Sequence, residues 1–179
     1  MDDLILIALS DEAPTLAKLP NVFQTGVGKV NAGIAAAKLI ERYRPRRVWN
    51  FGSAGGITVG SGLHRCSRFI QRDMIVTALG FAPGQTPFEK DIQLDFGHPG
   101  LICSSGDSFV TSSDLAIPAD LVDMEAYALA KACKTTNTEF HCYKFISDQA
   151  NETSDHDWRT NLHLGEPLYM DLLNSFHVI

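Results

Sequence analysis

Residues 122–131 read Val-Asp-Met-Glu-Ala-Tyr-Ala-Leu-Ala-Lys and predict a helix with an acidic pair at its entrance. Apolar side chains recur at i, i+3 and i+4 spacing, and a lysine stands near the far end, where the helix dipole favours a cation. Asp123 is a candidate N-cap, and Glu125 falls in the predicted first turn, where an anion is stabilised even without a function. The stretch alone therefore leaves two readings of Glu125 open: a structural acid at a helix start, or a group in a ligand cleft.

Three other segments end an apolar run in polar or glycine residues. They read Ala-Leu-Ser-Asp-Glu at 8–12, Asn-Phe-Gly-Ser-Ala-Gly-Gly at 50–56 and Phe-Ile-Ser-Asp at 145–148. The first of them closes the continuous apolar run of residues 4–9, which is typical of a strand buried on both faces of a parallel sheet. Ligands bind beyond the carboxyl ends of such strands, so Glu12 is well placed for a site, with a solvated turn acid as the alternative.

Length and composition indicate one α/β domain over residues 1–179, because a chain of 179 residues with 45% apolar content can bury a substantial core. The net charge of -6 argues against a polynucleotide ligand. The four cysteines lack Cys-x-x-Cys spacing, which predicts reduced thiols and favours the cytoplasm. The chain starts with acidic residues, and its first apolar run is too short for a signal peptide or a membrane span, so no membrane partner is expected.

Further elements follow from the same patterns. Strands are expected at residues 21–24, 46–51 and 141–148, and helices at about 30–43 and near the C-terminus. The stripes predicted to pack are Ile34, Ala37 and Ile40 in the first helix and Leu168, Leu172 and Phe176 in the last. The strand at 46–51 is expected to break at the glycines that follow it, where the backbone can approach a ligand. The polar residues 151–157 are a candidate lid, and His156 within them is expected at the surface.

The turn Thr-Gly-Val-Gly at residues 25–28 could be mistaken for a nucleotide-binding loop. A dinucleotide fingerprint needs a third glycine where Asn31 stands, and a P-loop needs Ser or Thr where Val30 follows the lysine. We therefore expect Gly26 and Gly28 to be turn residues that adopt φ values other residues avoid.

In their order along the chain, these segments resemble the 5′-methylthioadenosine/S-adenosylhomocysteine nucleosidases, within the purine nucleoside phosphorylase superfamily. The resemblance extends from the N-terminus to about Trp158. Within this range, residues 26–30, 105–109 and 124–126 also follow the order of the family's motifs. It implies a single-domain, three-layer α/β fold around a central mixed, mostly parallel sheet. Family members usually carry an extra antiparallel strand pair after their first acid, and only residues 13–25 are available for it here, so the fold is expected to be abbreviated near the N-terminus.

The resemblance also implies an N-glycosidic hydrolase. It assigns Asp148 as the general acid at the purine N7, with Ser147 as its hydrogen-bond partner. It assigns Glu12 to the activation of the attacking water, with Ser53 and Lys144 beside it. Cleavage builds positive charge on the ribose and negative charge on the base, so an acid at the base and anions near the sugar suit the reaction. Lys144 stands where the family commonly has arginine, which keeps the charge but loses the planar fork.

The substrate contacts implied by the resemblance lie in the central part of the chain. Glu125 would bind the ribose 2′- and 3′-hydroxyls, and Met124 would pack against the sugar. Phe109 would stack on the adenine ring, and the backbone of Val110 would read its edge. No metal or cofactor is implied.

An apolar, Pro- and Gly-rich loop at residues 79–88 is unusual for a monomer. In family members this loop reaches the neighbouring subunit and forms a wall of its 5′-alkylthio pocket. The matching positions here are Leu79, Phe81 and Pro87. The resemblance therefore implies a homodimer, and the alternative is a loop folded back on its own core.

Asn50 bears on the choice between hydrolysis and phosphorolysis. Related phosphorylases hold phosphate with an arginine two residues before the pair Gly52-Ser53, and Asn50 occupies that position here, so a phosphate dianion would be poorly held. The expected activity is hydrolysis of 5′-alkylthio-adenosine nucleosides with release of adenine and water as the nucleophile. The alternatives are a phosphorylase or nucleosidase of another purine nucleoside, such as a futalosine, and a nucleoside-binding protein without turnover.

Overall fold

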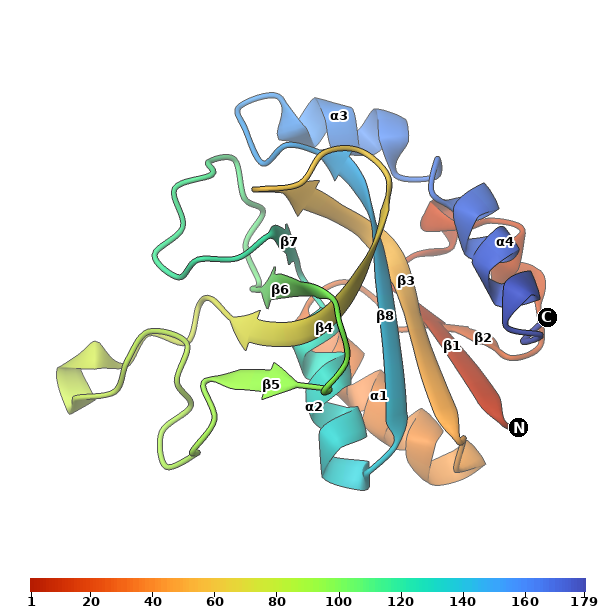
Figure 1. Cartoon of the computed structure of the whole chain (residues 1–179), viewed down its shortest axis with the longest axis horizontal. Helices are drawn as coiled ribbons and strands as arrows, with labels where there is room; N and C mark the ends of the chain where they lie inside the picture. The colour runs from red at the N-terminus through yellow and green to blue at the C-terminus, as the bar shows by residue number, and fades with distance from the viewer.

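One mixed sheet of eight strands organises the chain, in a computed structural model that describes residues 1–179 (Figure 1). The strands are β1 (Asp3–Ile7), β2 (Val22–Gln24), β3 (Arg47–Gly56), β4 (Leu63–Gln71), β5 (Gln93–Asp95), β6 (Leu101–Ser105), β7 (Leu121–Asp123) and β8 (Glu139–Asp148). The helices are α1 (Lys29–Tyr43), α2 (Ala126–Thr136), α3 (Ser154–Asn161) and α4 (Glu166–Ser175), with short 3₁₀ turns η1 (Ser10–Glu12), η2 (Leu16–Lys18) and η3 (Thr77–Leu79).

Five of the strands close into a ring. β8 lies between β3 and β4, and β3 and β4 are also joined through β7 and β6. Five of the eight strand pairs are parallel, which confirms a mixed, mostly parallel sheet. Between β1 and β2 the chain forms only η1 and η2, so the fold is abbreviated there as expected, yet the ring closes without the missing strand pair.

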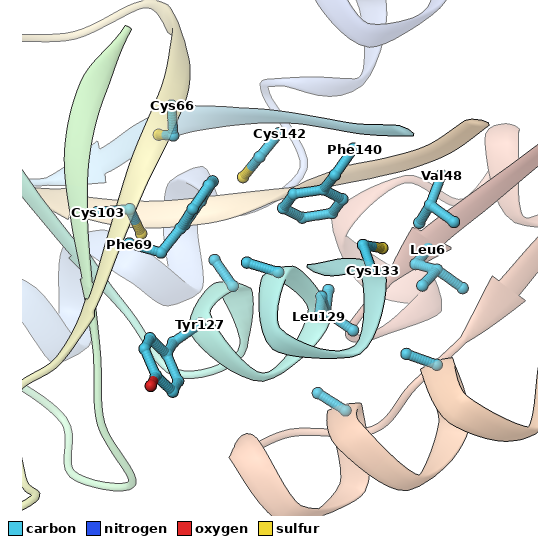
Figure 2. Packing of buried hydrophobic residues seen from close by; sticks show 14 of the residues in the cluster. Leu6, Val48, Cys66, Phe69, Cys103, Tyr127, Leu129, Cys133, Phe140 and Cys142 are labelled. Carbon is cyan, nitrogen blue, oxygen red and sulfur yellow. The ribbon is translucent and has the colours of Figure 1, made fainter. Parts of the chain in front are cut away.

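Helices cover both faces of the sheet and bury two separate cores, which makes three layers. α1 and α2 lie together on one face, over a core that includes Leu6, Val48, Phe69, Leu129 and Phe140 (Figure 2). α4 covers the other face, over a second core that includes Ile5, Trp49, Phe51, Tyr169 and Leu173. Because side chains alternate along β1 and β3, neighbouring residues of one strand enter different cores.

The packing stripe predicted for α1 was right at Ile40 and wrong at Ile34 and Ala37. Ala32, Ala36 and Ile40 are buried, whereas Ile34 is 52% exposed and Ala37 is exposed. The small side chains of Ala32 and Ala36 let the inner face of α1 pack closely on the first core.

The stripe predicted for the C-terminal helix was also displaced. Tyr169 and Leu173 are fully buried, while Leu168 and Phe176 remain about 40% exposed. The Tyr169 ring packs against Phe51 at a centroid distance of 4.9 Å, so the i, i+4 pair that enters the core begins one residue later than expected.

Strand β3 does not break at Gly52, contrary to the sequence prediction. It continues to Gly56, with a register shift against β8 between Ala54 and Gly55. A Cβ atom on Gly55 would lie 3.0 Å from Asp148 Oδ1, so this glycine lets the strand pass close to that carboxyl group.

The four cysteines are free and buried, which confirms the prediction of reduced thiols; Figure 2 shows all of them within the first core. None of the helices combines the length and the apolar character required to cross a bilayer.

Candidate active site

A cavity of about 140 Å³ opens beyond the carboxyl ends of β1, β3 and β8. This volume is well above the roughly 10–15 Å³ that one water molecule requires on the same measure. Its walls combine apolar side chains with four acidic residues from distant parts of the chain. The lining residues are Ala8, Leu9, Glu12, Val27, Ser53, Ala54, Gly55, Arg72, Ser108, Phe109, Val110, Val122, Asp123, Met124, Glu125, Asp148 and Trp158. The structure thus brings together Glu12, Ser53, Phe109, Val110, Met124, Glu125 and Asp148 from the predicted site.

Glu12 is fixed by donors on both carboxylate oxygens. It sits in η1, directly after β1, and is only 4% exposed. Its Oε1 accepts hydrogen bonds from the Ser53 amide at 2.8 Å and the Ser53 hydroxyl at 2.7 Å, while Oε2 accepts one from the Leu9 amide at 3.2 Å. The carboxylate is therefore held in one orientation at the cavity wall.

Asp148 ends β8, and its carboxyl group is also held locally. Oδ1 accepts a hydrogen bond from the Ala150 amide at 3.0 Å, and the Ser147 hydroxyl lies 2.9 Å from Oδ2. Ser147 is buried behind Asp148 and does not line the cavity, so it contacts the predicted acid and not the ligand space. This arrangement matches the expected pairing of the two side chains.

Glu125 is held by the glycine turn that precedes α1. Gly28 adopts a φ of 92°, as the sequence predicted for a turn glycine, and its amide donates to Glu125 Oε1 at 2.9 Å. Burial, together with the nearby Asp123 carboxylate, raises the pKa of Glu125 to about 7 against the opposing effect of Lys144. Glu125 is the N-cap residue of α2, not part of its first turn, and its side chain makes no capping bond.

Asp123 caps α2 from the end of β7. Its Oδ2 accepts the Ala126 amide at 2.9 Å, and its Oδ1 accepts the Ser105 hydroxyl at 2.5 Å. Ser105 in turn accepts the Tyr127 amide at 2.8 Å. The helix therefore starts at Ala126, later than the sequence suggested, and its first N–H groups are satisfied by two buried side chains.

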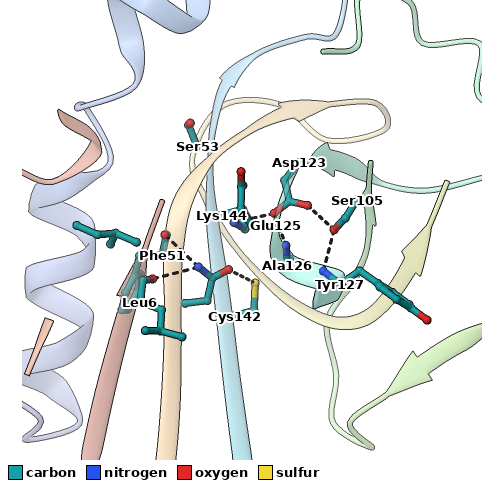
Figure 3. Close-up of polar contacts among 12 residues, drawn as sticks. Leu6, Phe51, Ser53, Ser105, Asp123, Glu125, Ala126, Tyr127, Cys142 and Lys144 are labelled. Atoms are coloured by element: carbon teal, nitrogen blue, oxygen red, sulfur yellow. Dashed lines mark hydrogen bonds and ion pairs between the residues drawn. The ribbon is translucent and has the colours of Figure 1, made fainter. Parts of the chain in front are cut away.

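Lys144 lies beneath the cavity and not in its wall. Its ammonium pairs with Asp123 Oδ2 at 2.9 Å, and both side chains are at most 2% exposed (Figure 3). Burial alone would lower the pKa of Lys144 and raise that of Asp123, but the ion pair outweighs burial: the pKa of Lys144 lies well above its usual value and that of Asp123 below it. A Cβ on Gly52 would lie 3.2 Å from Glu12 Oε1 and 3.3 Å from Lys144 Nζ, so Lys144 is near Glu12 without pairing with it.

The base-binding candidates sit on a segment that Arg72 holds in place. The Arg72 guanidinium donates to four backbone carbonyls, those of Ser104, Gly106, Ser108 and Asp123. Sequence reasoning missed this role, because the four acceptors are main-chain atoms that leave no side-chain pattern.

Trp158 was also missed as a cavity residue. It extends from α3 into the cavity wall, meets Phe109 edge-on at 6.3 Å, and donates its indole N–H to the Ser53 hydroxyl at 2.9 Å. The only sequence signal was its place at the end of the family resemblance. His156, in the same helix, is exposed as predicted.

Leu79, Phe81 and Pro87 do not line the cavity of their own chain. They belong to residues 72–92, a segment at the side of the sheet away from α4 (Figure 1). Leu79 is 72% exposed and Phe88 is 95% exposed, so this loop does not fold back on its own core.

Comparisons with known proteins agree with this architecture. A sequence model of the phosphorylase superfamily matches residues 15–96. The chain is 32% identical over 159 residues to the 5′-methylthioadenosine/S-adenosylhomocysteine nucleosidase of Staphylococcus haemolyticus, covering 74% of this chain and 69% of that protein. It is 36% identical over 154 residues to the nucleosidase of the same name from Haemophilus influenzae, covering 71% and 67%.

Solved structures show the same fold. The nucleosidase of Neisseria meningitidis in complex with methylthio-immucillin-A matches with a TM-score of 0.81 and 25% identity, covering 93% of this chain and 94% of that one. The futalosine hydrolase of Helicobacter pylori shares the fold with a TM-score of 0.88 at 19% identity, covering 97% and 95%. With these sequence relatives and this arrangement of strands and acids, the chain belongs to the 5′-methylthioadenosine/S-adenosylhomocysteine nucleosidase family.

Proposed function

We propose that this protein hydrolyses the N-glycosidic bond of 5′-alkylthio-adenosine nucleosides, such as 5′-methylthioadenosine and S-adenosylhomocysteine, and releases adenine. The observation that carries the proposal is the convergence of Glu12, Glu125 and Asp148 on one cavity beside Phe109 and Met124. The bond cleaves through a state with positive charge on the ribose and negative charge on the base. Carboxylates near the sugar and an acid near the base stabilise both.

Each acid has a distinct task in this proposal. Asp148 delivers a proton to N7 of the purine, and Ser147 orients its carboxyl group. Glu125 accepts hydrogen bonds from the ribose hydroxyls with the oxygen that Gly28 leaves free. Glu12, held by Ser53, directs the attacking water to the anomeric carbon.

The substrate-side residues follow from the same geometry. Phe109 and the backbone of Val110 would hold the adenine, and Met124 would pack on the sugar face. Lys144 lies beneath the cavity and would influence the site indirectly, through its ion pair with Asp123 and its position near Glu12.

Water is favoured over phosphate because the candidate cations are already engaged. The Asn50 amide, at the position used for phosphate by related phosphorylases, is buried and donates to the Leu6 carbonyl at 3.1 Å. Arg72 donates its four terminal N–H groups to backbone carbonyls, and Lys144 is paired with Asp123. A phosphate dianion in this cavity would therefore meet no free fork of donors.

Adenine release from 5′-methylthioadenosine tests the proposal directly. We expect adenine and free 5-methylthioribose at the same rate with and without inorganic phosphate. A sugar 1-phosphate product would identify a phosphorylase. Nucleoside binding without adenine release would identify a binding protein, and faster cleavage of futalosine would identify the other substrate class.

We also propose a homodimer in which the loop of residues 79–88 completes the 5′-alkylthio pocket of the partner. The exposed Leu79 and Phe88 support it, since large apolar side chains at a loop tip are stabilised by burial in an interface. Light scattering should give a dimer that the Phe88→Ser substitution weakens. Leu164→Ser, which changes an exposed leucine outside this loop, is the control and should leave the dimer intact. A fully active monomer at micromolar concentration would exclude the shared pocket.

We further propose that the protein works in the reducing cytoplasm. The support is that all four thiols are free within the core. Fractionation of the source cells with an antibody to this chain would test the location.

A further inference from the structure

A chain of three hydrogen-bonded side chains links α3 to the proposed water site. The Trp158 indole Nε1 lies 2.9 Å from Ser53 Oγ, and Ser53 Oγ lies 2.7 Å from Glu12 Oε1. The three residues come from α3, β3 and η1, and all of them line the same cavity. The contact between Trp158 and Ser53 is therefore a tertiary one that forms only when α3 is docked.

The chemistry of these groups fixes the direction of each bond. An indole N–H can only donate, so Ser53 Oγ must accept from Trp158. A hydroxyl has one proton, and with one lone pair engaged by Trp158 the proton of Ser53 is directed to the Glu12 carboxylate. Ser53 is left with one free lone pair and no free donor.

This arrangement determines how a water molecule can bind. A water beside Ser53 and Glu12 can donate one proton to the remaining Ser53 lone pair and the other to a carboxylate oxygen. It meets no donor from Ser53, so its own lone pair stays free to attack the anomeric carbon. Without the indole N–H, the Ser53 hydroxyl can rotate and donate to the water, which engages the lone pair that attack requires.

We propose that Trp158 is a positioning residue for hydrolysis, which locks the Ser53 hydroxyl onto Glu12 and so orients the attacking water. The inference rests on the proposed function and deepens it, because it makes the docking of α3 a condition for a reactive water. Trp158 itself acts through Ser53 and does not need to touch the reacting atoms.

The hydrogen bond can be tested without any substrate. The chain has only two tryptophans, so its ¹⁵N–¹H spectrum contains two indole signals, and Trp158→Phe identifies one of them by its loss. We expect Ser53→Ala to shift the Trp158 signal and to speed its hydrogen exchange. The Trp49 signal should stay in place, because Trp49 donates to Asp3 and not to Ser53. If Ser53→Ala changes neither the chemical shift nor the hydrogen exchange of the Trp158 indole, the inference is overturned.

Steady-state kinetics test the consequence. Trp158→Phe keeps an aromatic ring against Phe109 and removes the donor, so we expect kcat to fall about threefold to tenfold, the range for one neutral hydrogen bond, with KM within about twofold. Ser53→Ala should cost less in the Trp158→Phe background than in the wild type, because the two groups act as a unit. Trp49→Phe is the matched control: it deletes the other indole donor and should leave kcat and KM unchanged.

The outcomes separate this inference from the proposed function. A wild type that releases adenine, together with a Trp158→Phe variant of unchanged kcat or with additive effects of the two substitutions, would overturn the inference and leave the function standing. A wild type that releases no adenine would overturn the proposed function, and the inference would fall with it. A reduced kcat, an unchanged KM and a positive coupling with Ser53 support both.

Discussion

Asp123 and Glu125 stand two residues apart, and both are buried, at 6% and 7% exposed, yet their electrostatic surroundings differ. Asp123 faces the Lys144 ammonium and two further donors, the Ser105 hydroxyl and the Ala126 amide, and its pKa lies below its usual value although burial opposes this. Glu125 has one backbone donor and no ion pair, and burial raises its pKa to about 7. The intervening Met124 turns the chain from strand to helix and sends the two carboxyl groups into different environments.

The difference teaches how to tell a buried acid whose partners are all within the protein from one that is open to a ligand. An acid that is buried with a full set of partners has no capacity left for a ligand, and Asp123 is of this kind. An acid that is buried with an unused oxygen at a cavity is unstable as a charge until a ligand supplies donors, and Glu125 is of this kind. Glu12 and Asp148 stand at the same cavity.

The largest expected effect comes from removing a cavity acid. Asp148→Asn keeps the shape and can still donate a hydrogen bond but cannot transfer a proton, so we expect the rate of adenine release to fall about 10²-fold to 10⁴-fold, with nucleoside binding largely intact. An assay of adenine release measures the rate, and isothermal titration calorimetry measures nucleoside binding. Asp155→Asn, at an exposed aspartate in α3, is the control and should change neither. An Asp148→Asn variant within a few-fold of wild type, or one that is folded but does not bind, would contradict the assignment.

Breaking the paired acid should instead affect folding. Asp123→Asn leaves the Lys144 ammonium buried without a counterion, so we expect the free energy of unfolding to fall by about 3–5 kcal/mol in urea titrations. Asp73→Asn is the matched control, because Asp73 pairs with Lys29 at a site where its side chain is 33% exposed. That pair should contribute at most about 1 kcal/mol. Equal losses in the two variants would show that burial does not distinguish these ion pairs.

Glu125→Gln sharpens the comparison at the neighbouring residue. The ribose hydroxyls donate to a carboxylate, whereas an amide accepts at one atom and presents donors at the other, so we expect kcat/KM to fall by more than about tenfold, or roughly 1.4 kcal/mol. Stability at neutral pH should not fall as it does for Asp123→Asn, because the replaced carboxylate is poorly solvated there. A smaller loss of activity would return Glu125 to a structural role.

The effect of pH on stability should have opposite signs for the two acids. With its pKa near 7, Glu125 is neutral below that pH, so kcat/KM should fall by about tenfold for each unit below about 7 and level off above it. The raised pKa of Glu125 stabilises the folded state at pH values below the pKa of the unfolded state, about 4.3. This contribution to the free energy of unfolding is lost as the pH rises towards 7. The lowered pKa of Asp123 contributes stability above its unfolded value, lost as the pH falls. Unfolding titrations of Glu125→Gln should lack the first trend only.

Much of the fold could be predicted because it depends on local patterns. The continuous apolar run of residues 4–9 identifies β1, and the largely apolar stretch before Asp148, interrupted by Lys144, identifies β8; strand ends in a parallel sheet place Glu12 and Asp148 at one edge. β4 escaped prediction, since it reads Leu-His-Arg-Cys-Ser-Arg-Phe-Ile-Gln and its apolar positions are interrupted by Arg65 and Arg68. A strand that pairs with β5, β6 and β8 needs less sequence signal of its own than an isolated one.

The rest of the site depends on tertiary contacts. Which stripe of α1 faces inward depends on its packing against the first core, where Ala32 and Ala36 are buried although Ile34 is more apolar. The indole of Trp158 reaches Ser53 across 105 residues of sequence, and no spacing rule connects them. The cavity acids themselves could be named from the sequence because a family resemblance supplied what periodicity does not.

The place of β8 has a consequence for synthesis and refolding. This strand, the last along the chain, inserts between β3 and β4 and carries Asp148 at its end. On a ribosome, Glu12, Ser53 and Glu125 emerge before it, so a nascent chain already holds these three cavity residues while it still lacks Asp148. Pairings between segments this distant in sequence form slowly. Recovery of adenine release after dilution from denaturant should therefore follow the slowest phase of sheet formation, which makes catalysis a reporter of the finished ring.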